Sequence, residues 1–210
     1  FMMYFNAITE DRRANPRNDL ASVIANGKIN GEPLGHLEAM SYYIIAATAG
    51  HDTTSSTTAG AMWALAQNPD QFAKVKANPA LIPGLVEESI RWVTPVKHFM
   101  RTATDDAELA GKKIAKGDWL MLSYPSGNRD DAAFKDPFKF DVERTPNKHV
   151  AFGYGAHVCL GQHLARMEMR ILWEELFARI QSVELNGEPR NMVANFVCGP
   201  KAVPIAFKAH

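Results

Sequence analysis

Apolar residues in the first third of the chain recur at helical intervals between runs of turn-forming residues. Residues 1–13 and 18–26 show this spacing on either side of an Asn-Pro-Arg-Asn segment, which predicts two short helices. Gly27 and residues 30–33, Asn-Gly-Glu-Pro, mark turns. No proline interrupts residues 34–67, where helical spacing continues, so we expect one long helix. At about 1.5 Å per residue it would be roughly 50 Å long.

Proline residues delimit two further helices before the pattern changes to that of strands. One helix is predicted from Pro69 to Ala77. Another is predicted over residues 79–93 and ends before Thr-Pro, because a residue that precedes proline avoids helical backbone angles. Residues 102–124 combine short apolar runs with glycine turns, which predicts a small sheet, and residues 119–122, Trp-Leu-Met-Leu, are expected to form a buried strand.

The last part of the chain combines a long loop, a helix and short strands. Residues 130–150 contain scattered prolines and phenylalanines, so we expect a long packed loop of the kind that often carries function. A helix is predicted from residue 160 to about residue 180, and the C-terminal segment has the pattern of hairpins. The whole pattern predicts a mainly helical protein with small β-sheets, of the α+β class.

Composition excludes several classes of protein. With 46% hydrophobic and 22% charged residues, the chain is typical of a globular protein. The 23 Lys and Arg residues balance the 23 Asp and Glu residues, so no overall positive field attracts nucleic acid. The long helix is not expected to span a membrane, because residues 50–58 form a polar run.

Cysteine use and the N-terminus indicate the compartment. Two cysteines, Cys159 and Cys198, are too few for a disulfide scaffold and suit a reducing environment. The first residues lack the features of a secretory signal, so we expect a cytoplasmic protein. Because the chain begins at Phe1 in the middle of an amphipathic pattern, we interpret it as part of a longer chain.

Cys159 lies in a glycine-containing segment, Phe-Gly-Tyr-Gly-Ala-His-Val-Cys-Leu-Gly. This segment matches the pattern FxxGxxxCxG at Phe152, Gly155, Cys159 and Gly161. Glycines let the backbone approach a flat cofactor, and the start of the following helix would stabilise a thiolate. The alternative is that Cys159 is a small buried hydrophobic residue, which is the more common role of an isolated cysteine. Cys198 has no such motif around it, so we expect it to be a small buried hydrophobic residue.

Two further motifs carry polar chemistry. In the long helix, residues 49–54 (Ala-Gly-His-Asp-Thr-Thr) weaken helix stability and would permit a local bulge. The alternative is a solvated stripe at residues 55–58 with Asp52 as a surface carboxylate. Glu88 and Arg91 lie three residues apart on one helical face, where an exposed pair is worth only about 0.2–0.5 kcal/mol.

These three motifs, in this order, resemble those of the cytochrome P-450 superfamily of haem-thiolate monooxygenases, and the resemblance covers nearly the whole chain. It implies the C-terminal half of that fold, with a long central helix and a cysteine-ligand loop, and haem b (iron protoporphyrin IX) as cofactor. Cys159 would be the axial iron ligand. Asp52 and Thr53 would organise proton delivery during the activation of O₂.

The resemblance implies further residues around the haem. Phe152, Gly155 and Gly161 would belong to the cofactor-binding loop. Arg101 and His157 would donate charge-assisted hydrogen bonds to the haem propionates, unless they are ordinary surface groups. A buried triad would hold the cysteine loop, and loss of one partner would cost about 3 to 5 kcal/mol. The members of this triad would be Glu88, Arg91 and Arg144.

Substrate and redox partners also follow from the resemblance. Within the family, four segments are most similar to bacterial terpineol-hydroxylating members, which implies O₂ and an apolar substrate of the terpenoid class. Electrons would come from an iron-sulfur ferredoxin and its NAD(P)H-dependent reductase, with Arg166 and Arg170 supplying positive charge for docking. No nucleic-acid or membrane partner is expected. The substrate-facing residues would be Ala49, Val96, Phe99, Phe196 and Val197.

The domain organisation leaves two alternatives open. Residues 1–210 would form the C-terminal part of a single catalytic domain whose N-terminal half is absent. One alternative is a haem-thiolate peroxygenase that uses hydrogen peroxide, against which the Asp52-Thr53 pair argues. The other is a non-catalytic fragment that does not retain haem.

Overall fold

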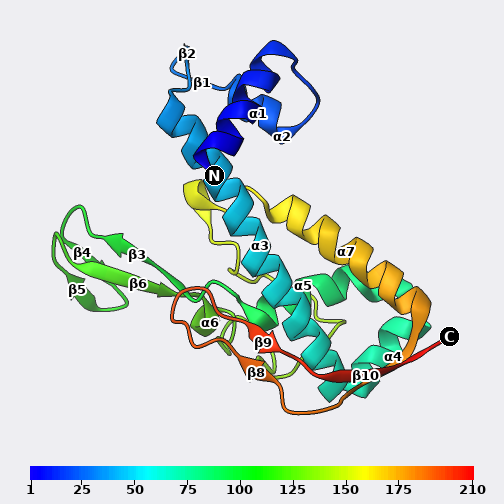
Figure 1. The fold of residues 1–210 in the computed structure, drawn as a ribbon. Helices are drawn as coiled ribbons and strands as arrows, with labels where there is room; N and C mark the ends of the chain where they lie inside the picture. The colour runs from blue at the N-terminus through cyan, green and yellow to red at the C-terminus, as the bar shows by residue number, and fades with distance from the viewer. The chain divides into compact units, whose positions relative to one another are not determined.

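A computed structural model describes all 210 residues and shows a mainly helical fold with small two-stranded sheets (Figure 1). The α+β class predicted from the sequence is confirmed. The chain forms two compact units, Phe1–Asp52 and Thr53–His210, and the boundary lies within helix α3 (His36–Gln67). None of the helices is both long enough and apolar enough to cross a lipid bilayer.

The first unit packs two short helices against the N-terminal part of α3. Its small core contains Ile24, Leu34, Ala39 and Tyr43, and the Phe5 ring stacks on the Tyr43 ring with centroids 4.8 Å apart. Two short strands pair antiparallel, so the turn predicted between them closes a hairpin. The elements before α3 are α1 (Met2–Ala14), α2 (Leu20–Ala25), β1 (Lys28–Ile29) and β2 (Glu32–Pro33).

Helix α3 runs without interruption through the polar segment in its middle. The hydroxyls of Thr57 and Thr58 donate hydrogen bonds to the carbonyl oxygens of Thr53 and Thr54, at 2.8 and 2.9 Å. These bonds satisfy the hydroxyls inside the helix, so the segment does not need to open. The bulge that the sequence suggested is therefore absent, since every residue of α3 is α-helical.

The second unit is built on a layer of helices that share one hydrophobic core (Figure 1). Leu65, Val75, Leu85 and Trp173, from four different helices, are all completely buried in it. Each square ångström of apolar surface removed from water contributes about 25 cal/mol, which makes this core the main stabilising element of the unit. The helices that follow α3 in this layer are α4 (Pro69–Ala77), the short 3₁₀ helix η1 (Pro79–Leu81), α5 (Ile82–Val93) and α7 (Gln162–Arg179).

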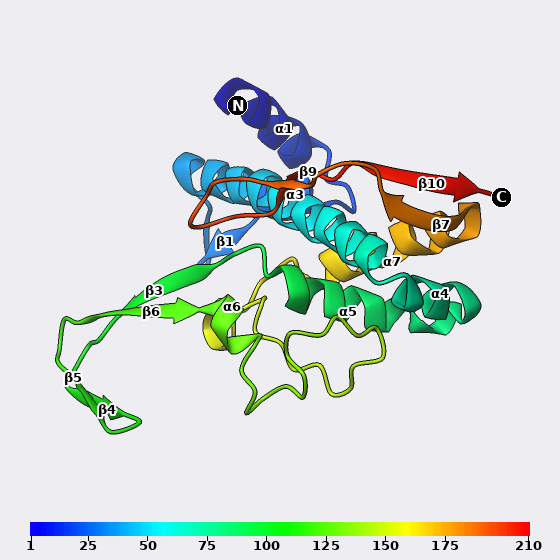
Figure 2. The ribbon, with the colours of Figure 1, turned by 90° about the horizontal axis from the view of Figure 1, so that it is seen from below.

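A β-arm extends from the helical layer of the second unit, as Figure 2 shows. It is an antiparallel ribbon of β3 and β6 with the β4–β5 pair at its tip. The prediction of a buried strand here is wrong, because Trp119 is 80% and Met121 is 61% exposed. The ribbon has only two strands, and most of its side chains are exposed. The strands are β3 (His98–Thr102), β4 (Ala107–Leu109), β5 (Lys112–Ile114) and β6 (Trp119–Ser123).

The C-terminal segment forms the predicted hairpins, one nested inside the other. β7 follows α7 directly and pairs antiparallel with β10 near the end of the chain, while β8 pairs with β9 between them. The strands are β7 (Ile180–Leu185), β8 (Arg190–Asn191), β9 (Pro200–Ala202) and β10 (Ile205–Ala209).

An irregular loop over residues 128–154 follows the short helix α6 (Tyr124–Gly127) and lies along α5 (Figure 2). Phe140 and Val142 enter the core of the helical layer. A Cβ atom at Gly84 of α5 would lie only 2.3 Å from the carbonyl oxygen of Val142, so the loop backbone rests directly on the helix. The prediction of a long packed loop is confirmed.

Candidate functional site

The segment from Phe152 to Cys159 closes on itself as a compact loop. The amide of Cys159 donates to the carbonyl oxygen of Phe152 at 2.9 Å, and the amide of Val158 donates to that of Gly155 at 3.0 Å. Gly155 has a φ of +75°, which side-chain-bearing residues rarely adopt, and a Cβ atom there would have no neighbour within 4 Å. The glycine therefore both permits the turn and leaves the surface open. We name residues 152–161 the cysteine loop.

Cys159 lies just before α7 rather than at its first turn. The helix begins at Gln162 with Gly161 as its N-cap, two residues later than predicted, and the Gln162 amide lies 3.4 Å from the Cys159 carbonyl oxygen. The side chain of Cys159 is exposed. The alternative interpretation of Cys159 as a small buried hydrophobic residue is therefore wrong.

The surroundings of Cys159 fit a flat, largely apolar group. Tyr154 and Leu160 are 91% and 93% exposed, and Val158 is also exposed. Large apolar side chains grouped in this way indicate a surface that binds something. No cluster of His, Cys, Asp and Glu side chains in the chain could hold a metal ion by itself.

Two basic side chains that were predicted to bind haem propionates, Arg101 and His157, are both exposed to solvent. Arg101 lies on β3, where its Nη1 donates to the Met100 carbonyl oxygen at 2.9 Å. His157 lies in η2 (Gly155–His157), within the cysteine loop. Both side chains therefore reach solvent.

The structure brings Glu88, Arg91 and Arg144 together in the interior. Glu88 and Arg91 have no exposed surface, and Arg91 Nε and Nη2 each donate to a different Glu88 carboxylate oxygen at 2.7 Å. Arg144 Nε reaches Glu88 Oε2 at 3.1 Å from the irregular loop. Arg91 Nη1 also donates to the carbonyl oxygens of Asn128 and Pro137, at 2.8 and 2.9 Å. The single Glu88 carboxylate thus lies between two guanidinium groups, and the irregular loop is tied to α5.

Two asparagines that the sequence did not single out extend this network. Asn147 Nδ2 donates to Glu88 Oε2 at 3.1 Å. Asn128, which is fully buried, donates to Thr94 Oγ1 at 2.8 Å and accepts from the Val150 amide at 2.7 Å. No local pattern could have identified Asn128, because its partners lie 34 and 22 residues away in the sequence.

Asp52 and Thr53 lie at the boundary of the two units on α3. Asp52 is exposed, and its Oδ1 lies 2.9 Å from Nδ1 of His51. Thr53 is half-buried. The alternative of a solvated stripe at residues 55–58 is wrong for Ser56 and Thr57, because these residues are only 4% and 3% exposed.

Four of the five predicted substrate-facing residues meet within the second unit. Val96 and Val197 form an isolated antiparallel bridge. The Phe99 and Phe196 rings meet edge to face with centroids 5.3 Å apart. The structure therefore brings the segment after α5 beside the C-terminal segment. The fifth residue, Ala49, belongs to the first unit.

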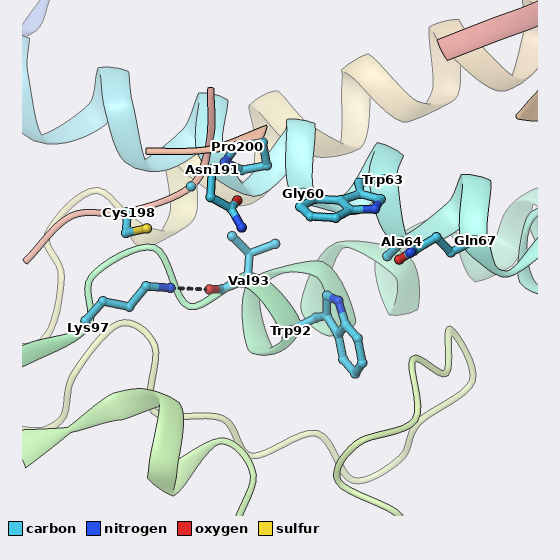
Figure 3. Close-up of a pocket in the computed structure, with 11 residues that line it drawn as sticks. Gly60, Trp63, Ala64, Gln67, Trp92, Val93, Lys97, Asn191, Cys198 and Pro200 are labelled. Atoms are coloured by element: carbon cyan, nitrogen blue, oxygen red, sulfur yellow. Dashed lines mark hydrogen bonds between the residues drawn. The ribbon is translucent and has the colours of Figure 1, made fainter. Parts of the chain in front are cut away.

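A separate cavity of about 230 Å³ contains none of the cysteine-loop residues (Figure 3). Cys198 lines it, half-buried, and its Sγ donates to the Met192 carbonyl oxygen at 3.3 Å. Lys97 Nζ donates to the Val93 and Thr94 carbonyl oxygens at 2.9 and 2.8 Å. Burial lowers the pKa of Lys97. Cys198 thus has local partners and shares no surface with Cys159.

The predicted docking charges Arg166 and Arg170 differ in their surroundings. Arg166 forms a two-point ion pair with Glu87, so it is not the free surface charge that we expected. Arg170 is exposed, and its nearest carboxylate, that of Glu174, lies 3.9 Å away. Glu87 was not predicted from the sequence. A sequence signal for it existed, because the adjacent residues Glu87 and Glu88 must point in different directions from the helix and so must have different neighbours.

Comparisons with known proteins agree on one family. The family model described as Cytochrome P450 matches residues 2–205. "Cytochrome P450-terp" from Pseudomonas sp is 54% identical over 207 residues, which cover 99% of this chain and 48% of that protein. Linalool 8-monooxygenase from Pseudomonas putida is 39% identical over 99% of this chain and 51% of its own length.

Solved structures give the same result. CYP108D1 from Novosphingobium aromaticivorans superposes with a TM-score of 0.95 at 55% identity, over 100% of this chain and 51% of the other. CYP109E1 from Bacillus megaterium, in complex with testosterone, superposes with a TM-score of 0.92 at 33% identity, over 99% of this chain and 58% of the other. The chain spans about half the length of the curated relatives that it matches.

Proposed function

Because this chain belongs to the cytochrome P450 family, we propose that it supplies the haem-thiolate centre of a monooxygenase that hydroxylates an apolar small molecule. It would form the C-terminal part of a single catalytic domain. Members of the family bind haem b. The observation that carries the proposal is the exposed Cys159 thiol in a glycine-containing loop bordered by exposed apolar side chains.

The proposed haem site uses residues of the second unit. Cys159 would bind the iron as a thiolate, which is the form of cysteine that binds metals. Gly161 leaves space beside the sulfur, Gly155 leaves the surface of the turn open, and Phe152 supplies apolar surface. Arg101 and His157, both exposed to solvent, would donate charge-assisted hydrogen bonds to the propionates.

Asp52 and Thr53 would transfer protons from solvent. When bound, haem supplies the reductive activation of O₂. Asp52 is exposed and can exchange protons with water, while the adjacent Thr53 hydroxyl can both accept and donate a hydrogen bond. An acid next to an alcohol can therefore pass protons from solvent towards the reaction centre. This pair favours a monooxygenase over a peroxygenase, which needs no such delivery.

Replacing Thr53 with alanine in the full-length protein should separate oxygen consumption from hydroxylation. The variant loses the hydroxyl that would pass the proton, so the product formed per O₂ consumed should fall about tenfold or more. Thr53→Ser keeps the hydroxyl and should retain most of the coupling. Thr58→Ala is a matched control in the same helix. Coupled turnover in Thr53→Ala would exclude this role.

We propose a terpenoid substrate on two grounds. The four substrate-facing residues that meet in the second unit are all apolar, which suits a hydrocarbon skeleton. One relative is named for its action on linalool, a terpene alcohol. Ala49 of the first unit is proposed as a substrate-facing residue on the family resemblance alone.

Labelled oxygen tests the proposed activity. The full-length protein should hydroxylate terpineol or linalool when supplied with a ferredoxin, its NAD(P)H-dependent reductase and ¹⁸O₂, and one ¹⁸O atom should enter the product. Hydroxylation that requires hydrogen peroxide instead would establish the peroxygenase alternative. A full-length protein that binds no haem would establish the non-catalytic alternative.

The electron donor that we propose is an iron-sulfur ferredoxin, which implies a cytoplasmic reaction. Its docking surface would include Arg170, because Arg166 is already neutralised by Glu87. Arg170→Glu should raise the ferredoxin concentration needed for half-maximal turnover about three- to tenfold at low salt. Added salt should shrink the difference. Arg179→Glu, at the other end of α7, is the control, and equal effects of both changes would refute this docking site.

A further inference from the structure

Helix α5 carries two adjacent glutamates that bind different parts of the molecule. Glu88 lies in the buried network with Arg91 and Arg144. Glu87 points elsewhere, because successive helical residues are rotated by about 100°. Its carboxylate contacts Arg166 of α7 and His149 of the irregular loop. One turn of α5 therefore holds both sides of the cysteine loop.

The contact with Arg166 is geometrically specific. Arg166 Nε lies 2.6 Å from Glu87 Oε1, and Nη2 lies 3.1 Å from Oε2. A two-point pair of this kind fixes the plane of the guanidinium group. The same guanidinium carbon lies 4.6 Å from the centroid of the Phe152 ring, within the range of a cation–π contact. Glu87 thus holds the cation that covers Phe152.

His149 contacts the same carboxylate and the same ring. Its Nε2 lies 3.0 Å from Glu87 Oε2, and its ring centroid lies 5.8 Å from that of Phe152. The His149 side chain is only 3% exposed. Burial raises the pKa of Glu87, but hydrogen bonds from His149 and Arg166 and their charges outweigh this, and the pKa falls from 4.5 to about 2. The carboxylate is therefore ionised at neutral pH.

Phe152 connects these contacts to the cysteine. Its carbonyl oxygen accepts the hydrogen bond from the Cys159 amide at 2.9 Å, which closes the cysteine loop. A shift of the Phe152 ring would move this carbonyl and hence the backbone that carries the sulfur. A continuous series of contacts leads from Glu87 through Arg166 and Phe152 to Cys159.

We propose that Glu87 and Arg166 are positioning residues that fix Phe152 and thereby hold Cys159 in its metal-binding geometry. The inference rests on the proposed role of Cys159 as iron ligand. A structural salt bridge alone would affect only stability. A positioning pair would in addition change the state of the sulfur on the iron, and that state can be measured separately.

The test uses the full-length holoprotein and its carbon monoxide complex after reduction. Glu87→Gln and Arg166→Leu should each raise the ratio of thiol-ligated to thiolate-ligated complex at least threefold, as expected for coupled contacts. The ratio is taken per haem bound, so that a loss of folded protein does not affect it. Arg166→Lys keeps the charge but not the two-point geometry and should give an intermediate ratio.

A charge swap and a control variant complete the experiment. The double variant Glu87→Arg/Arg166→Glu should recover part of the wild-type ratio, which a general loss of stability would not do. Glu174→Gln, which removes only the partner of Arg170, should leave the ratio unchanged. Wild-type ratios in all Glu87 and Arg166 variants would overturn the positioning role alone. Absence of a thiolate-type spectrum in the wild type would overturn both this inference and the proposed function.

Discussion

Replacing Arg91 with methionine should lower the free energy of unfolding of the full-length protein by about 3 to 5 kcal/mol. The change leaves the fully buried carboxylate of Glu88 without its two-point partner. It also leaves the carbonyl oxygens of Asn128 and Pro137 without their side-chain donor, whereas that of Lys139 keeps its hydrogen bond from Arg144. A buried group that loses its hydrogen-bond partner carries the full cost of desolvation.

Burial decides the size of this effect. A glutamate and an arginine three residues apart on an exposed helix would contribute only about 0.2–0.5 kcal/mol to the free energy of unfolding. Urea unfolding of the variant measures the difference, with Arg179→Met as control, because Arg179 is an exposed member of an i,i+4 pair on α7. A loss below about 1 kcal/mol for Arg91→Met would show that Arg144 and Asn147 compensate for Arg91, and the network would then not depend on it.

Replacing Cys159 with serine in the full-length protein should abolish both hydroxylation and the thiolate-type carbon monoxide difference spectrum. A serine hydroxyl stays protonated at neutral pH and cannot replace a thiolate as electron donor to iron. Serine is similar in size to cysteine, and Cys159 is exposed, so the fold should remain intact. The effect should therefore be chemical and not a consequence of unfolding.

The second cysteine provides the matched control. Cys198 is half-buried and bonds to the Met192 carbonyl oxygen, away from the cysteine loop. Cys198→Ser should keep the spectrum and the activity, because a hydroxyl can donate to the same carbonyl oxygen. Full activity in Cys159→Ser, or equal losses in the two variants, would remove Cys159 from the proposed centre.

Local signals predicted the helices and the cysteine loop well. The bounds of α4 agree with the sequence because Pro69 can begin a helix but cannot continue one. The cysteine loop could be predicted because its turn requires glycine at a fixed position. Gly155 has a φ of +75°, which few other residues adopt. Such requirements act within a few residues and are visible in the sequence.

Features that depend on distant neighbours could not be predicted. The apolar run at Trp119 indicated a strand but not its exposure, which depends on whether another layer covers the ribbon. Arg166 looked like a docking charge because its partner, Glu87, lies 79 residues away in the sequence. Only the fold brings α5 beside α7.

The binding of iron by Cys159 is most directly tested by X-ray absorption at the iron edge of the full-length ferric protein. We expect one sulfur atom in the first coordination shell of the iron in the wild type and in Cys198→Ser, and no sulfur in Cys159→Ser. An iron centre that has no sulfur ligand in the wild type, or that keeps its sulfur in Cys159→Ser, would contradict this expectation.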